Sequence, residues 1–329
     1  MKRRYSNLSL YRLIATILVL QFHIFFIIYA KNIVASVYLS KFLQGLTALS
    51  GFLYSQKVID HVGKFYLIRI KKIILPAILV LLVIGLWNLL AMFVLNNYDY
   101  LSLFVGHRAF NNSLLISPGN FYYIPFILGC YLITPLLRKW KWSGLIIVPL
   151  VMFLETFIPI RCNVDPLFIV SCYLIGFYVG YFGYSRYVNK YTKSDIIRLI
   201  VWAILFAAFI YISHSFIDGS FKVKKYIHVY RNIFLSLFGV SSLFLFAMIF
   251  KFINAYKDIP LLKLTDDFTY IIYLYNQAMM VGATDVSSFV STYAGKTIMV
   301  YLFVLSLSLL TYYIYKLLDK RIKKLKFLS

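Results

Sequence analysis

The first apolar run of the chain carries two ionisable side chains, Arg12 and His23, eleven residues apart. In a helix, eleven residues make almost three full turns, so both side chains project from one face, roughly 16 Å apart along the axis. Histidine takes up and returns a proton near neutral pH, as a general base on a hydroxyl group does. The planar guanidinium of arginine suits a phosphate group. We therefore expect one helix face to bind an anionic ligand and to move a proton, with Arg12 and His23 as its catalytic residues.

A structural alternative exists for both side chains. Arg12 would reach lipid headgroups, and His23 would hydrogen-bond to a neighbouring helix. An ionisable group deep in an apolar run is costly enough that function is the default hypothesis, and the pairing of two such groups on one face strengthens it.

Three cations form a second candidate group, Arg69, Lys71 and Lys72, which precede Pro76. Arg69 and Lys72 lie one helical turn apart, and clustered cations bind the phosphates of nucleotide-like ligands. We expect them to hold such a ligand, although anchoring of a membrane helix on its cytoplasmic side explains them about as well.

Two further polar residues are possible supports of this chemistry. Ser50 belongs to a Ser-Gly-Phe step (50–52) that permits close helix approach and a hydrogen bond across it. Glu155 is the only glutamate of the chain and lies in an apolar run. It would orient His23 or bind an acceptor hydroxyl, or else pair with Arg161 at the membrane interface.

The elements that position these residues follow from the composition. Of the 329 residues, 62% are hydrophobic and 14% charged, against about one-quarter charged in a soluble domain. The apolar residues fall in about ten runs, each close to the roughly 20 residues that span a bilayer as a helix. We predict an all-α integral membrane protein in a single domain, residues 1–329, with no separate soluble domain and with spans at 8–29, 42–58, 73–95, 121–137, 144–160, 167–182, 196–213, 232–253, 268–283 and 297–318.

The basic residues set the orientation. The net charge is +23, and with the first span starting in the cytoplasm, 24 of the 34 Lys and Arg residues fall in cytoplasmic segments and 9 in outer ones. This bias predicts that both termini are cytoplasmic. The surplus charge is then explained by topology and anionic lipids, so we expect no nucleic-acid partner. No histidine or cysteine spacing suggests a metal site.

Taken together, these motifs resemble acyltransferase family 3, the integral-membrane acyltransferases. The matching pattern covers nearly the whole chain, and Arg-x10-His is its most specific part. It consists of Arg12-x10-His23, Ser50-Gly51-Phe52, Arg69-x-Lys71-Lys72 before Pro76, Asn120-Phe121-Tyr122-Tyr123 leading to Thr134-Pro135-Leu136-Leu137, and Tyr270-x-x-Tyr273-Leu274-Tyr275.

The resemblance implies an enzyme that moves an acyl group, usually acetyl from acetyl-CoA, onto hydroxyls of cell-envelope glycans in a bacterial inner membrane. The residues needed for activity would be Arg12 and His23. Acyl-CoA would be a co-substrate, with no tightly bound cofactor. Envelope glycan, membrane lipids and a separate extracytoplasmic transferase or glycan-synthesis protein are the expected partners.

The chain departs from the family pattern at three places, one of which is that Ser50-Gly51-Phe52 lacks the usual Phe-Phe run before it. It has Phe121-Tyr122-Tyr123 where many members carry tryptophan, and Asn276 where many carry histidine. These departures bear on the acceptor more than on the reaction. An exporter or flippase of a surface polysaccharide, in which Arg12 and His23 line a polar path, is the alternative function.

Overall fold

The computed structural model describes residues 6–29, 34–95, 121, 123–140, 142, 146, 166–189, 191–217, 227–253, 260–276, 278–280 and 286–324. These residues are helical apart from turns and short connections, as the apolar runs predict. The helices are α1 (Ser6–His23), α2 (Val34–Ser40), α3 (Phe42–Tyr54), α4 (Val62–Leu95), α6 (Tyr123–Lys139), α8 (Pro166–Val188), α9 (Ser194–Ile217), α10 (Ile227–Ile253), α11 (Pro260–Asn276) and α12 (Tyr293–Lys324).

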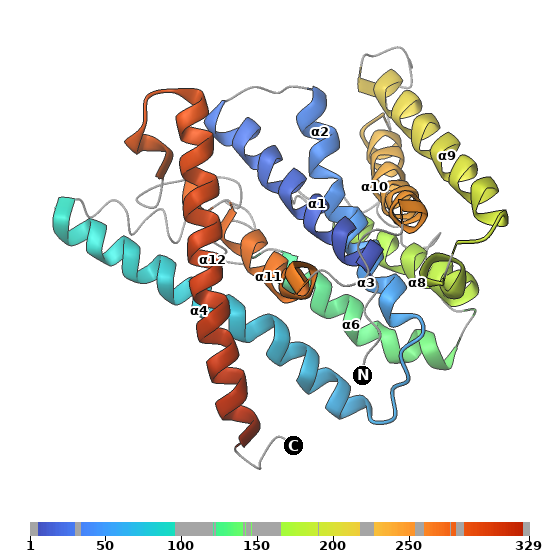
Figure 1. The fold of residues 1–329 in the computed structure, drawn as a ribbon, viewed down its shortest axis with the longest axis horizontal. Helices are drawn as coiled ribbons and strands as arrows, with labels where there is room; N and C mark the ends of the chain where they lie inside the picture. The colour runs from blue at the N-terminus through green and yellow to red at the C-terminus, as the bar shows by residue number, and fades with distance from the viewer. Residues whose placement is uncertain are drawn as a thin grey trace.

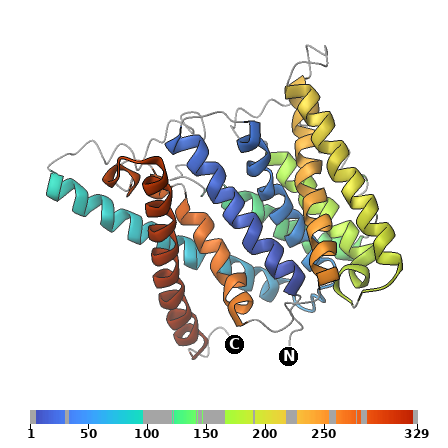
Figure 2. The ribbon, with the colours of Figure 1, turned by 45° about the horizontal axis from the view of Figure 1, so that its top comes forward.

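Helix α1 lies in the middle of the bundle and contacts α3, α10 and α11. Helix α9 packs on α10 at one edge, whereas α12 and the oblique α4 form the opposite edge (Figure 1). The N-terminal end of α1 and the C-terminal end of α12 point to the same side of the molecule (Figure 2). The same view shows α1 and α11 running in the same direction.

The outer helices present apolar side chains away from the bundle. Ile197 and Ile204 on α9 and Leu302 and Leu317 on α12 are all exposed. Five described segments are long and apolar enough to cross a membrane, namely Asn7–Ile28, Phe168–Val188, Ser194–Ile217, Tyr230–Ile253 and Tyr293–Arg321. Because exposed apolar helix faces of this kind are stable in lipid and not in water, the chain is an integral membrane protein.

Most predicted spans coincide with helices, with three differences. The fifth, at 144–160, lies outside the described residues except for residue 146, and Glu155 lies outside them too. The third was expected from Ile73, but α4 begins at Val62 and carries Pro76 in its interior. A proline removes only one helical hydrogen bond, so the apolar and basic residues before it continue the same helix. The ninth, expected from Phe268, begins at Pro260, a residue that favours the first helical position, and the helix ends at Asn276.

Close packing of α3 against α8 depends on glycine. A Cβ atom on Gly176 would lie 2.7 Å from the Ala48 Cα, and one on Gly51 would lie 2.9 Å from the Phe177 backbone nitrogen. Small residues at such positions let two helix backbones approach closely in a membrane. The Ser-Gly-Phe step at 50–52 therefore does pack a helix pair, as its small residues predict.

Polar contacts fix the position of α1 in the bundle. The Asn7 amide donates to the backbone oxygens of Tyr187, at 3.0 Å, and Ala247, at 3.2 Å. One turn further on, the Tyr11 hydroxyl lies 3.0 Å from the Ser242 hydroxyl, with Tyr11 fully buried. These bonds set the rotation and depth of the helix that carries Arg12 and His23.

A buried ion pair joins α8, α9 and α10 near the N-terminal end of α1. Lys251 donates to the Asp195 carboxylate and to the Arg186 backbone oxygen, each at 2.7 Å. Arg198 also pairs with Asp195. Because both Lys251 and Asp195 are buried, the pair fixes the relative position of the three helices.

Candidate functional site

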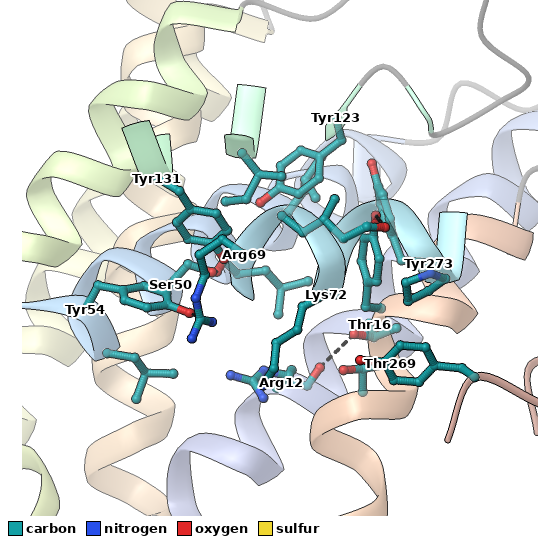
Figure 3. Close-up of a pocket in the computed structure, with 18 residues that line it drawn as sticks. Arg12, Thr16, Ser50, Tyr54, Arg69, Lys72, Tyr123, Tyr131, Thr269 and Tyr273 are labelled. Atoms are coloured by element: carbon teal, nitrogen blue, oxygen red, sulfur yellow. Dashed lines mark hydrogen bonds between the residues drawn. The ribbon is translucent and has the colours of Figure 1, made fainter. Parts of the chain in front are cut away.

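A cavity of about 280 Å³ lies between α1, α3, α4, α6, α11 and α12. Its lining residues come from segments far apart in the sequence (Figure 3). On α3 the lining extends from Leu43 to Tyr54, which is about 16 Å along the helix axis. On α6 it follows one face through Tyr123, Ile127 and Tyr131, which are spaced by four residues. The cavity is therefore elongated along the helices.

Three cations, Arg12 on α1 and Arg69 and Lys72 on α4, line the same cavity. They extend into one part of it, and none of its described lining residues is acidic (Figure 3). A partly buried group of like charges without acidic neighbours in the lining attracts an anion more strongly than the same charges in water. This part of the cavity is suited to phosphate groups.

Arg69 is held in place by aromatic neighbours. Its guanidinium hydrogen-bonds to the Tyr54 hydroxyl, and its central carbon lies 4.7 Å from the Tyr54 ring centre and 5.7 Å from that of Phe65. The buried Nε makes no hydrogen bond within the described part of the chain. The Nε–H group is thus left over for a ligand. The bond to Tyr54 already orients the planar guanidinium that carries it.

The rest of the lining is aromatic and weakly polar. Tyr131 hydrogen-bonds to Ser50, whose hydroxyl also bonds to the Leu46 backbone oxygen at 3.2 Å. The rings of Tyr123 and Tyr273 meet edge to face, with centres 5.5 Å apart. Such a lining suits an uncharged chain with a few amide groups rather than a second charged group.

The structure brings several of the sequence-predicted residues together. Arg12, Ser50, Arg69 and Lys72 all line the cavity. Lys71 points elsewhere and forms an ion pair of 2.9 Å with Asp319 on α12.

His23 is not among the lining residues and lies further along α1. Helix α1 is regular from Ser6 to His23, so the expected separation of roughly 16 Å from Arg12 holds along the axis. Thr16, which lines the cavity and bonds to the Arg12 backbone oxygen at 2.9 Å, shares the face of His23 two turns before it.

Directly after His23 the helix widens into a π-helical segment, Ile24–Ile28. Such segments are rare and frequently mark functional sites. Within the described residues, no hydrogen bond or ion pair to the His23 ring is present, and its only recorded ring contact is with Phe22 at 4.7 Å. Its ring nitrogens are therefore not committed to a described protein group.

Sequence reasoning did not assign a role to the tyrosines of the cavity. Their helical spacing indicates a shared helix face, since Tyr123 and Tyr131 are eight residues apart and Thr269 and Tyr273 are four apart. A chain with 29 tyrosines offers many such pairs, however. Among the described residues, no group of three His, Cys, Asp or Glu side chains could hold a metal ion.

Comparison with known proteins identifies the family of the chain. Residues 5–316 match the family model described as Acyltransferase domain, which is that of acyltransferase family 3. No curated protein and no solved structure matches the chain. The match includes Arg12, His23 and every helix that lines the cavity. The chain therefore belongs to acyltransferase family 3 and is a membrane acyltransferase.

Proposed function

We propose that the protein transfers an acetyl group from cytoplasmic acetyl-CoA to a hydroxyl of a cell-surface polysaccharide or lipid-linked glycan, in the inner membrane of a bacterium. The observation that carries this proposal is the convergence of Arg12, Arg69 and Lys72 on one elongated cavity, together with the position of Arg12 on the same helix as His23. The envelope glycan, membrane lipids and a separate extracytoplasmic glycan-synthesis protein would be its partners.

The donor site follows from the charge distribution of the cavity. Coenzyme A carries several phosphates at one end and an uncharged pantetheine arm that ends in the thioester. The phosphates would bind Arg12, Arg69 and Lys72, which extend into one part of the cavity (Figure 3). The arm would follow the tyrosine-lined part, where few charged groups compete for it.

This orientation of the coenzyme agrees with the excess of Lys and Arg in the segments assigned to the cytoplasm. Arg12 stands six residues after the first residue of α1, and α1 begins on the side where α12 ends (Figure 2), the side that we assign to the cytoplasm. The thioester would then point along α1 toward His23. The acceptor would approach His23 from the other side.

The chemistry requires a proton acceptor and a good leaving group. His23 would take the proton from the acceptor hydroxyl while the hydroxyl oxygen attacks the thioester carbonyl carbon. The new C–O bond forms, the C–S bond breaks, and the coenzyme leaves as a thiol after taking up a proton. A transient acyl-His23 intermediate would divide the same transfer into two steps. The thioester supplies the driving force, so the coenzyme is a co-substrate and no tightly bound cofactor takes part.

Transfer of label from acetyl-labelled acetyl-CoA in isolated membranes tests the proposal. Wild type should label envelope glycan, and His23→Ala should not, because the proton acceptor is lost. Exposed His61, just before α4, provides the matched control, and His61→Ala should retain labelling. Absence of label in wild type, together with loss of the surface polymer on deletion, would instead favour the exporter. Retained labelling in His23→Ala would refute the role of His23.

A further inference from the structure

On α6 and α11 the lining of the cavity ends at two tyrosines, Tyr123 and Tyr273, on the side away from its cations. Tyr123 and Tyr273 both line it, and both are buried (Figure 3). Their rings meet edge to face at 67°, with centres 5.5 Å apart. Edge-to-face pairs of this kind are attractive and leave little free space between the rings. The two rings therefore narrow the cavity between α6 and α11 at this level.

The position of Tyr123 is fixed by a directed hydrogen bond. Its hydroxyl lies 2.9 Å from the Thr47 hydroxyl, and Thr47 donates its own proton to the Leu43 backbone oxygen at 3.0 Å. The single Thr47 proton is thus used, so Tyr123 must donate to Thr47. Thr47 is fully buried on α3, which anchors the tyrosine to a helix that packs tightly on α8.

The tyrosine pair lies just short of His23 along the helices. Helices α1 and α11 run side by side in the same direction, and Thr16 and Thr269 line the cavity from each of them (Figure 2). Seven residues beyond these threonines stand His23 and Asn276, and the segments that follow, Ile24–Ile28 and Ala278–Met280, are again in contact. His23 is therefore level with Asn276. Tyr273, three residues before Asn276, lies about 4.5 Å below that level.

We propose that Tyr123 and Tyr273 limit the length of the acyl chain, so that the donor is acetyl-CoA or a comparably short acyl-CoA. This inference rests on the proposed function. With the phosphates on the cations, the thioester end of the arm reaches the tyrosine pair, and the acyl group has only the space between that pair and His23. A longer chain must displace a buried ring that is held by a hydrogen bond and by an edge-to-face contact.

The test compares acetyl-, butyryl- and octanoyl-CoA as donors, using kcat/KM for transfer to glycan in membranes. Wild type should prefer acetyl-CoA, and Tyr273→Ala should lower its preference over octanoyl-CoA by about tenfold or more, the scale on which pocket size discriminates methylene groups. The matched control is Tyr275→Leu. Tyr275 is equally buried two residues away on α11, but it bonds to Thr311 on α12 at 2.8 Å and does not line the cavity. The preference of Tyr275→Leu for acetyl-CoA over octanoyl-CoA should equal that of wild type.

Each result is informative. Transfer from acetyl-CoA with the same chain-length preference in wild type and Tyr273→Ala would overturn the tyrosine limit and leave the proposed function standing. If Tyr273→Ala fails to fold, wild type still decides, because equal use of octanoyl- and acetyl-CoA by wild type would refute the limit. No transfer from any acyl-CoA by wild type would overturn the proposed function and this inference together.

Discussion

Replacement of Gly176 by alanine should separate α3 from α8. The new Cβ would lie 2.6 Å from the Ala48 carbonyl carbon and 2.7 Å from its Cα, whereas ordinary contact begins at 3.4 Å. The Ala48 carbonyl oxygen would lie closer still, so the two backbones must part by at least about 0.8 Å. None of these atoms belongs to a flexible side chain, so a rotamer change cannot relieve the overlap.

The magnitude follows from two opposing terms. Overpacking costs about 1–3 kcal/mol. This site belongs at the upper end of the range, because the new Cβ would meet backbone atoms, which cannot move aside as a side chain can. Alanine regains up to about 1 kcal/mol of helix propensity over glycine. We expect Gly176→Ala to lower the free energy of unfolding by about 2 kcal/mol.

Gly129 on α6 is the matched control, because a Cβ there would meet nothing within 4 Å. Gly129→Ala should be neutral or stabilising by up to about 1 kcal/mol, so the two variants should differ by about 2–3 kcal/mol. The assay is reversible unfolding in mixed micelles with a denaturing detergent. Because α3 carries Ser50 and Tyr54 into the cavity, Gly176→Ala should also raise the KM for acetyl-CoA. Equal unfolding free energies for the two variants would refute the close-packing argument.

The remaining predictions concern charged residues. Lys251→Met should lower the free energy of unfolding by about 3 kcal/mol, the lower end of the cost of breaking a buried ion pair, because Arg198 still pairs with Asp195. Adding Asp195→Asn should recover part of this loss in a double-mutant cycle, and independent, additive losses would contradict the pairing. Lys72→Met should raise the KM for acetyl-CoA about tenfold or more. Lys71→Met should raise it less, since of these two lysines Lys72 lines the cavity and Lys71 pairs with Asp319. Equal KM values for the two variants in initial-rate assays would argue against the donor site. Arg69→Lys keeps the charge but loses the planar fork, so its KM should also rise, and an unchanged KM would show that charge alone suffices.

The sequence alone determined the class of protein and the face of the first helix. Apolar runs of membrane-spanning length are a local property, because the cost of placing a polar residue in lipid is set residue by residue. The spacing of Arg12 and His23 is equally local, since the helix period fixes which side chains share a face. The family resemblance rested on such motifs, and the match over residues 5–316 confirms it.

Only the tertiary structure decided which side chains share a cavity. Lys71 and Lys72 are adjacent in the sequence, but they project about 100° apart around α4, and the packing of that helix directs one to Asp319 and the other into the cavity. The tyrosines of α6 and α11 join the same site because distant helices meet there, which no local period encodes. The π-helical segment after His23 likewise depends on how α1 ends against its neighbours, since its apolar residues would suit an ordinary helix equally well.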